Sequence, residues 1–305
     1  MRVLASGLRF PEGPVALANG DLLLVEIARG TLTRVKPDGR IEVVATPGGG
    51  PNGLALGPDG SCYVCNNGGS TWHEKNGQLF PAHADEASYS GGRIERVDLR
   101  TGRVEVLYRQ CEGRLLRGPN DLVFDAHGGF WFTDHGKTFA RTRDRTGVFY
   151  AKADGSLIRE ALFPLDAPNG IGLSPDGQTL YVAETNAARL WAFELAAPGE
   201  IKRFRGSVAW QRGSLLHGDA RFVQFDSLAV DSAGHVCVAT IADGGITAVR
   251  PDGSGWEFVP LPDPLTTNLC FGGTDRRTAY VTLSSTGRLV AIPWPRPGLR
   301  LNYEQ

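Results

Sequence analysis

The chain has 305 residues, of which 41% are hydrophobic, and it contains 40 Gly and 19 Pro but a single Met. This much glycine and proline without a collagen-like period indicates many tight turns, so we expect a β-rich rather than a helical protein. The 32 basic and 33 acidic residues are interspersed and give a net charge of -1, which excludes the basic surface that nucleic acid or an anionic membrane requires.

The start of the chain and its cysteines indicate a cytoplasmic protein. The segment MRVLASGLRFPEGP has no apolar core of signal-peptide length, and no run approaches the roughly 18 apolar residues of a membrane span. Five Cys, an odd number, suit reduced thiols. Cys62 and Cys65 form a CxxC pattern, but residues three apart on a strand point to opposite faces. We therefore interpret both as small buried hydrophobic residues rather than as a metal or redox pair.

Six copies of one pattern follow along the chain, each with a polar residue, a short apolar run, a turn and a second apolar run. They read FPEGPVALANGDLLLVE from Phe10, GPNGLALGPDGSCYVCN from Gly50, GPNDLVFDAHGGFWFTD from Gly118, APNGIGLSPDGQTLYVAE from Ala167, QFDSLAVDSAGHVCVAT from Gln224 and TTNLCFGGTDRRTAYVT from Thr266. The polar heads are Glu12, Asn52, Asn120, Asn169, Asp226 and Asn268, which are 40, 68, 49, 57 and 42 positions apart. Such periods are typical of propeller blades with loop insertions.

A second hairpin follows most copies, for example TLTRVKPDGRIEVVA after the first and RLWAFELAAPGEIKRFR after the fourth, so each repeat predicts a four-stranded blade. The sixth copy ends one strand short, before a Pro-rich tail. The N-terminal RVLASGLRFPEGP resembles IEVVATPGGGPNGL, a fourth strand leading into the next blade. We predict that residues 2–6 pair beside residues 287–293. The fold is then an all-β, six-bladed β-propeller, one domain over residues 1–305, whose N-terminal strand closes the last blade.

The first strand of every propeller blade lines the central channel, so the six heads are predicted to converge at one mouth. Carboxylate and amide oxygens suit a hard divalent cation, and without one Glu12 and Asp226 would repel each other. The alternative is that Asn, Asp and Gly only mark the turns before strands. That alternative applies best to Asn52 and Asn268.

At this point the sequence resembles the senescence marker protein, gluconolactonase and luciferin-regenerating enzyme family of six-bladed propellers. Its marks are FPEGP, GPNDL, PNGIGLSPDGQTLYVAET and DSLAVDSAGHVCVA, in order at matching repeat positions. The resemblance implies that Glu12, Asn169 and Asp226 bind the metal and that Asn120 binds metal-bound water or substrate. It also implies one divalent cation, Ca²⁺ first, with Zn²⁺, Mn²⁺ or Mg²⁺ as alternatives.

Family enzymes mostly open lactones or related esters, and the predicted ring suits that chemistry. A cation would polarise a substrate carbonyl while a carboxylate, Asp226 or else Glu12, removes a proton from water. We expect a small-molecule substrate and a monomer or weak homo-oligomer. The alternatives are a phosphotriesterase-like hydrolase on the same site, a non-catalytic propeller that binds a ligand or partner, and an enzyme of the strictosidine synthase type.

Loops at the predicted metal mouth are expected to set specificity. Residues 66 to 92 form the longest, and we predict that they cover the mouth as an irregular loop containing Trp72 and His83. The third repeat brings His135, with Lys137 and Phe139, to the same rim, where a His could act as an acid or base or only form a hydrogen bond. The candidates for substrate binding are thus Asn120, Asn52, Trp72 and His135. An ordinary surface loop is the alternative.

Overall fold

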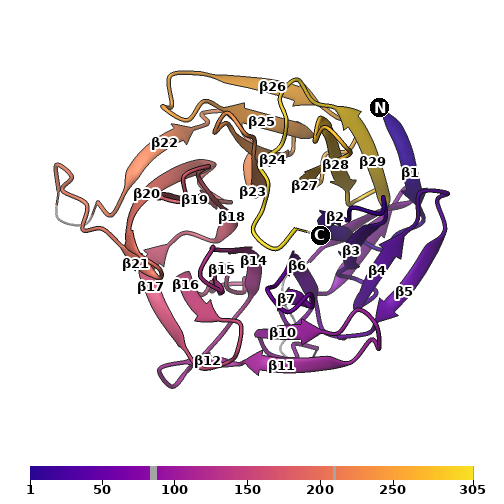
Figure 1. The fold of residues 1–305 in the computed structure, drawn as a ribbon, viewed down its shortest axis with the longest axis horizontal. Coiled ribbons are helices and arrows are strands. Elements are labelled where there is room, and N and C mark those ends of the chain that lie inside the picture. Colours follow the sequence, from indigo (N-terminus) through magenta and orange to yellow (C-terminus); the bar gives the residue numbers. More distant parts are fainter. Residues whose placement is uncertain (83–87, 209–210, 305) are drawn as a thin grey trace.

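Short apolar runs joined by turns fold here as antiparallel hairpins, and the hairpins are arranged as blades around a central axis (Figure 1). The computed structural model describes residues 1–82, 88–208 and 211–304. Across these residues the regular elements are all strands, and no helix is long and apolar enough to cross a membrane. The strands form six blades, which confirms the predicted all-β, six-bladed propeller.

Each blade is named here by its strands, from the channel outward. Blade 1 has β2 (Pro11–Ala16), β3 (Leu22–Glu26), β4 (Thr31–Val35) and β5 (Ile41–Ala45); blade 2 has β6 (Pro51–Leu56), β7 (Cys62–Asn66), β10 (Arg93–Val97) and β11 (Val104–Tyr108); blade 3 has β14 (Pro119–Phe124), β15 (Gly129–Asp134), β16 (Thr146–Lys152) and β17 (Ile158–Leu165). Blade 4 has β18 (Pro168–Leu173), β19 (Thr179–Glu184), β20 (Arg189–Ala197) and β22 (Ser214–Gly218), with the short β21 (Glu200–Ile201); blade 5 has β23 (Gln224–Val230), β24 (Val236–Ile241), β25 (Gly245–Val249) and β26 (Trp256–Pro260). Two ribbons lie outside the blades, β8 (Trp72–Lys75) with β9 (Gln78–Pro81), and β12 (Gln110–Cys111) with β13 (Arg114–Leu115).

Blade 6 is built from both ends of the chain, as predicted. It contains β27 (Thr266–Gly272), β28 (Thr278–Leu283), β29 (Arg288–Pro293) and, outermost, β1 (Arg2–Ser6). Strand β1 pairs with β29 antiparallel, from Arg2 opposite Ala291 to Ser6 opposite Arg288. In Figure 1 the two strands lie side by side at the rim of the ring. This pairing removes the exposed edge that an incomplete sixth sheet would leave.

The outer strand of blade 4 differs from the prediction. The segment GEIKRFR was expected to be the fourth strand, but only Glu200–Ile201 pairs with β20, at its far end. The outer position is filled by Ser214–Gly218, which pairs with the first half of β20. Strand β20 is nine residues long, so two separate segments share its free edge. Sequence pattern alone favoured the nearer segment because it follows a tight Pro-Gly turn.

The core consists of apolar layers between neighbouring blades. One layer joins Leu23 and Val25 of blade 1 to Val64 of blade 2, and equivalent layers follow around the ring. Each large apolar side chain buried in them contributes about 1.5–3 kcal/mol to folding. Cys62 belongs to the layer between blades 1 and 2 and Cys65 to the layer between blades 2 and 3. All five cysteines are buried and free of disulfides, which confirms that the CxxC pattern is not a bridge.

Candidate active site

The six polar heads stand at the start of the innermost strand of each blade. They occupy the second position of β2, β6, β14 and β18 and the third position of β23 and β27. All six are buried, from 2% exposed for Glu12 to 9% for Asp226. Neighbouring inner strands approach closely, since a Cβ at Gly53 would lie 2.4 Å from the carbonyl oxygen of Asn120. Glycine after the head therefore lets the polar ring contract around the axis.

A register irregularity occurs at every head. The pairing of the first two strands shifts between Glu12 and Val15 in blade 1, and the other five blades show the same shift at the corresponding place. A β-bulge bends its strand and changes the direction of a side chain without ending the sheet. The repeated bulge is thus the local feature that separates the polar heads from the apolar alternation below them.

Residues at the ends of the second strands fix the approach to the ring, and sequence reasoning missed them. Glu26 accepts a hydrogen bond from the backbone N–H of Arg9 at 2.7 Å, and Asp134 accepts one from Gly118 at 2.6 Å. Asn66 and Glu184 make equivalent bonds in blades 2 and 4. The signal was present, because the first four sequence copies end in Glu, Asn, Asp and Glu.

Three carboxyl groups, not two, meet at the ring. Burial raises the pKa of Glu12, and burial together with the charges of Glu12 and Asp121 raises the pKa of Asp226 well above its usual value. Burial and the charge of Glu12 also raise the pKa of Asp121, to about 7. Within the described part of the chain, none of the three forms an ion pair with a basic side chain. The ring therefore gathers three acidic groups whose ionised forms are disfavoured without a cation.

Asp121 was absent from the sequence-based site, although its position could have been found there. The residue after the head is Gly13, Gly53 and Gly170 in three blades and Asp121 in blade 3. A side chain at this position faces the narrow channel just below the ring, where glycine elsewhere leaves room for the adjacent strand. The carboxylate of Asp121 accepts the backbone N–H of Leu122 at 2.9 Å.

The amides of the ring differ in how far their hydrogen bonds are satisfied. Asn268 donates to Glu12 Oε2 at 2.8 Å, and Gly13 N–H donates to the same oxygen at 2.9 Å, so Asn268 orients Glu12. The side-chain nitrogen of Asn169 donates to Thr185 at 3.0 Å, which fixes the amide's orientation. The buried Oδ1 of Asn120 has no hydrogen-bond partner among the residues that the structure describes. A buried amide oxygen without a donor is rare, so Asn120 has an open place for a ligand.

The oxygen atoms that the ring offers as metal ligands suit a hard cation. In the part of the chain that the structure describes, no three His, Cys, Asp or Glu side chains are grouped as metal ligands. A cation at the ring would therefore combine the carboxylates of Glu12 and Asp226 with amide oxygens such as Asn169 Oδ1. Oxygen ligands of this kind suit Ca²⁺, Mg²⁺ or Mn²⁺, and a dication would neutralise the buried carboxylates.

The rim of the mouth carries a β-hairpin where an irregular loop was predicted. Within residues 66 to 92, β8 and β9 pair from Trp72 opposite Pro81 to Lys75 opposite Gln78. Asn76 and Gly77 between them both have positive φ, 54° and 73°, as a type I′ hairpin turn requires. The Asn-Gly pair is a strong hairpin signal that the prediction overlooked. His83 belongs to residues 83–87, which lie outside the described residues.

The hairpin of β8 and β9 crosses from blade 2 to blades 1 and 6. Leu79 is buried against Phe10 and Ile27, and its backbone N–H donates to the carbonyl of Ser285 at 2.8 Å. The ring of Trp72 lies 4.9 Å from that of Phe10, two residues before Glu12. The hairpin thus covers the side of the mouth next to Glu12, and Trp72 packs at its base.

The predicted rim residue His135 follows β15 directly and is half-buried. Burial lowers the pKa of its imidazole to about 4, so the ring is neutral at pH 7. It can exchange hydrogen bonds with a substrate, but it carries no proton to donate as an acid. Asn52, the remaining predicted substrate contact, is buried at the start of β6 beside the ring.

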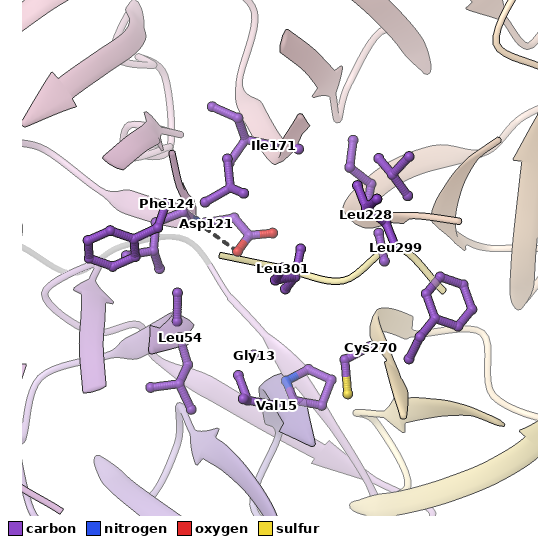
Figure 2. A pocket seen from close by; sticks show the side chains of 18 of the residues that line it. Gly13, Val15, Leu54, Asp121, Phe124, Ile171, Leu228, Cys270, Leu299 and Leu301 are labelled. Carbon is purple, nitrogen blue, oxygen red and sulfur yellow. Dashed lines mark hydrogen bonds between the residues drawn. The ribbon is translucent and has the colours of Figure 1, made fainter. Parts of the chain in front are cut away.

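Below the ring the channel becomes an apolar cavity of about 100 Å³ (Figure 2). Leu54, Ile171 and Leu228 line it, and the carboxylate of Asp121 lies among them. The C-terminal segment crosses the opposite mouth, where Leu299 and Leu301 close the cavity (Figure 1). The apolar floor keeps water from Asp121, which explains why its pKa is raised.

Comparisons with known proteins agree with this fold. The family model described as SMP-30/Gluconolactonase/LRE-like region matches residues 10–285. A gluconolactonase of Zymomonas mobilis is 28% identical over 303 residues, covering 89% of this chain and 76% of the relative. A diisopropyl-fluorophosphatase of Loligo vulgaris is 26% identical over 309 residues, covering 94% and 90% of the two chains. The crystal structure of regucalcin, a calcium-binding protein of Agrobacterium tumefaciens, has the same fold, with a TM-score of 0.70 at 20% identity over 98% of this chain and 97% of that one.

Proposed function

Because the chain belongs to the SMP-30/gluconolactonase/LRE-like family, we propose that it is a cation-dependent hydrolase that opens a lactone at the polar ring. The observation that carries this proposal is the gathering of three buried carboxyl groups that, among the described residues, have no ion-pair partner, together with the Oδ1 of Asn120, which has no hydrogen-bond partner there. Burying three acidic groups without ion-pair partners is costly, and a cation that replaces their protons accounts for their gathering at one place. Curated relatives named gluconolactonase and lactonase support the choice of a lactone.

Glu12, Asn169 and Asp226 would hold the cation, and Ca²⁺ is our first choice. These residues begin the inner strands of blades 1, 4 and 5, and hydrogen bonds from Gly13 and Asn268 to Oε2 orient the Glu12 carboxylate. A bound dication would withdraw electron density from the substrate carbonyl and offset the repulsion among the carboxylates. The calcium-binding regucalcin supports Ca²⁺ as the first cation to test.

The chain's own residues then perform the proton transfers. Asp226 accepts a proton from the attacking water, whose oxygen forms the new bond to the carbonyl carbon. The bond from that carbon to the ring oxygen breaks, and the proton passes from Asp226 to the departing alkoxide. Asn120 accepts a hydrogen bond from the substrate or water at its open Oδ1, and Asn52 lines the same side of the mouth. The product is a hydroxy acid.

A phosphotriesterase-like activity on the same ring is the second candidate. The diisopropyl-fluorophosphatase relative covers 94% of this chain, more than the gluconolactonase does, and its name indicates attack of water at phosphorus. Both reactions need a polarised oxygen and an oriented water, so the ring serves either. The substrate decides between them.

The test begins with protein stripped by a chelator and then supplied with Ca²⁺, Mg²⁺, Mn²⁺ or Zn²⁺ in turn, assayed on lactones and on organophosphate esters. We expect lactone hydrolysis that returns with one of these cations. Asp226→Ala should abolish turnover and weaken cation binding by calorimetry, whereas Asn52→Ala, the matched control in another blade, should affect cation binding little. Full activity in the stripped protein, or equal loss of cation binding in both variants, would refute the proposed site.

A further inference from the structure

Lys137 is a buried lysine at the metal-side rim that the proposed reaction does not use. It lies three residues after β15 (Gly129–Asp134), between the loops of blades 2 and 3, and is 6% exposed. Lysines are almost never buried this deeply unless a partner neutralises them. Its side chain therefore calls for a specific explanation.

Among the described residues, the hydrogen-bond acceptors of the Lys137 ammonium group are neutral, and the nearest acidic influences are the charges of Asp134 and Asp144, which act without an ion pair. The Nζ of Lys137 donates to Asn67 Oδ1 at 3.1 Å and to the carbonyl of Gly69 at 2.7 Å, and both acceptors are neutral. Through the described residues, no carboxylate lies within ion-pair distance of Nζ. An ammonium group has three N–H donors, and these two neutral acceptors take two of them without neutralising its charge. Burial lowers the pKa of Lys137 to about 8, which leaves it charged at neutral pH.

This ammonium group lies close to the polar ring. A Cβ at Gly50 would meet Asn67 Oδ1 at 2.2 Å and the backbone nitrogen of Gly69 at 2.8 Å. The two residues that hold Lys137 thus pack on Gly50, two positions before Asn52. Lys137 is therefore at the mouth beside blade 2, on the approach to the ring rather than within it.

An aromatic and cationic wall surrounds the same place. The ring of Tyr89 has Lys137 Nζ 5.5 Å from its centroid and the guanidinium of Arg117 at 5.4 Å. Arg117 is already paired with Asp144 at 2.9 Å, whereas Lys137 is not. The backbone N–H of Lys137 also donates to Asp144, at 3.0 Å, which fixes the loop. Among the described residues, Lys137 is thus the cation of this wall that forms no direct ion pair, although Asp134 and Asp144 lie near enough to act on its charge.

The loop that carries Lys137 is basic although the whole chain is nearly neutral. Residues 137–145 contain Lys137, Arg141, Arg143 and Arg145 but only one acidic residue, Asp144. A concentration of positive charge at the rim of a mouth attracts anions. Arg143 is paired with Asp166 at 2.6 Å, so the excess charge lies with the other basic residues of the loop, and it favours the same ligand chemistry as Lys137.

We propose that Lys137, walled by Tyr89, forms a subsite for an anionic group of the substrate, so that the enzyme prefers lactones that carry a carboxylate or phosphate remote from the lactone carbonyl. This inference rests on the proposed function, because the ring holds the lactone while Lys137 binds the charged end. Binding at two separate points orients the substrate as it enters.

The probes are two matched pairs of lactones that differ in charge. Glucono-δ-lactone is compared with its 6-phosphate, and glucono-γ-lactone with glucaro-γ-lactone, which carries a carboxylate. The wild-type enzyme should show a lower KM for the charged lactone than for the neutral one in one or both pairs. The pair that shows this difference tells whether the subsite prefers a phosphate or a carboxylate. Lys137→Gln retains a donor but removes the charge. It should raise KM for the charged lactone roughly 10- to 100-fold, as expected for a hydrogen bond to a charged group, and change the neutral lactone less than threefold.

The matched control is Lys152→Gln. Lys152 is also in blade 3, over the ring of Tyr150, and donates to the carbonyl of His127, but at the opposite mouth. It should leave both lactones unchanged. If Lys137→Gln does not fold, the wild-type enzyme provides the test, because salt screens the attraction between Lys137 and an anionic substrate. Between roughly 0.05 and 0.5 M NaCl, its KM for the charged lactone must rise while its KM for the neutral lactone stays constant.

Several outcomes would overturn the inference. One is no preference of the wild type for either charged lactone, and another is an equal rise in KM for neutral and charged lactones in Lys137→Gln. If no lactone is hydrolysed with any cation, the proposed function fails, and calorimetry with the open-chain acids, gluconate 6-phosphate and glucarate, still tests the subsite. Binding that Lys137→Gln abolishes would support it, and no binding to the wild type would refute it.

Discussion

Replacing Asp121 with Asn should stabilise the cation-free protein, because it removes a buried charge that has no cationic partner. The amide is nearly the same size and its oxygen can still accept the N–H of Leu122. Burial and the charge of Glu12 raise the pKa of Asp121 from 3.8 to about 7. Ionising this carboxyl in the folded state at pH 8 is therefore unfavourable.

The magnitude follows from the pKa. Each pH unit corresponds to 1.36 kcal/mol, so a rise from 3.8 to about 7 gives a ceiling of roughly 4 kcal/mol. The charge of Glu12 accounts for part of this energy, and burying the Asn amide also costs free energy. We therefore expect Asp121→Asn to raise the free energy of unfolding by about 2 kcal/mol at pH 8. Between about pH 4 and 7 the folded chain keeps a proton on Asp121 that the unfolded chain has released. Stability thus falls as pH rises through this window, so the gain from Asp121→Asn should be clearly smaller at pH 5 than at pH 8 and vanish only near pH 4.

Urea unfolding at pH 5, 6, 7 and 8 in the presence of a chelator measures this difference. The control is Asp125→Asn, just after the same strand, because Asp125 accepts hydrogen bonds from Tyr150 Oη at 2.7 Å and from the backbone N–H of His127 at 2.7 Å. This control should lose stability, since its carboxylate is fully used. A loss of stability in Asp121→Asn that is equal at all four pH values would show that Asp121 is not an uncompensated buried acid.

Three other outcomes are expected. Deleting residues 1–8 should lower the free energy of unfolding by at least about 3 kcal/mol, because β1 and the buried Leu8 are lost; unchanged thermal melting would contradict the ring closure. Leu79→Ala should loosen the hairpin of β8 and β9 and raise the KM for the substrate, while cation affinity measured by calorimetry stays the same. A loss of cation affinity would instead mean that the hairpin supports the ring. Because burial raises the pKa of Cys62 to about 12 and all five cysteines are buried, a thiol reagent should label five only after denaturation; rapid labelling of the native protein would contradict this.

The repeat determined the fold at the level of sequence. Six copies with a polar head, two apolar runs and a turn predict six blades, and a sixth copy that ends early predicts that the N-terminus completes it. These features are local or periodic, so they can be read without knowing which residues touch. The heads Glu12, Asn169 and Asp226 were recognisable for the same reason, because equivalent positions in a ring must face one axis.

Local signals that the sequence contained were also missed. Asn76-Gly77 marks the rim hairpin, and the acidic or amide residues that end the first four copies mark the anchors of the ring, with Asp134 among them. These errors arose from the choice of pattern and not from missing information. The outer strand of blade 4 is different, since two segments could compete for the edge of β20 and only their packing decided.

Tertiary structure alone decided the electrostatics of the site. The pKa of Asp121 depends on Glu12, more than 100 positions away in sequence, and on the C-terminal residues Leu299 and Leu301 that close the cavity beneath it. The isolation of Lys137 likewise depends on Asn67 and Gly69 of another blade. A sequence states which groups can carry charge, but burial and neighbouring charges fix whether that charge is compensated, and both exist only once distant segments have packed together.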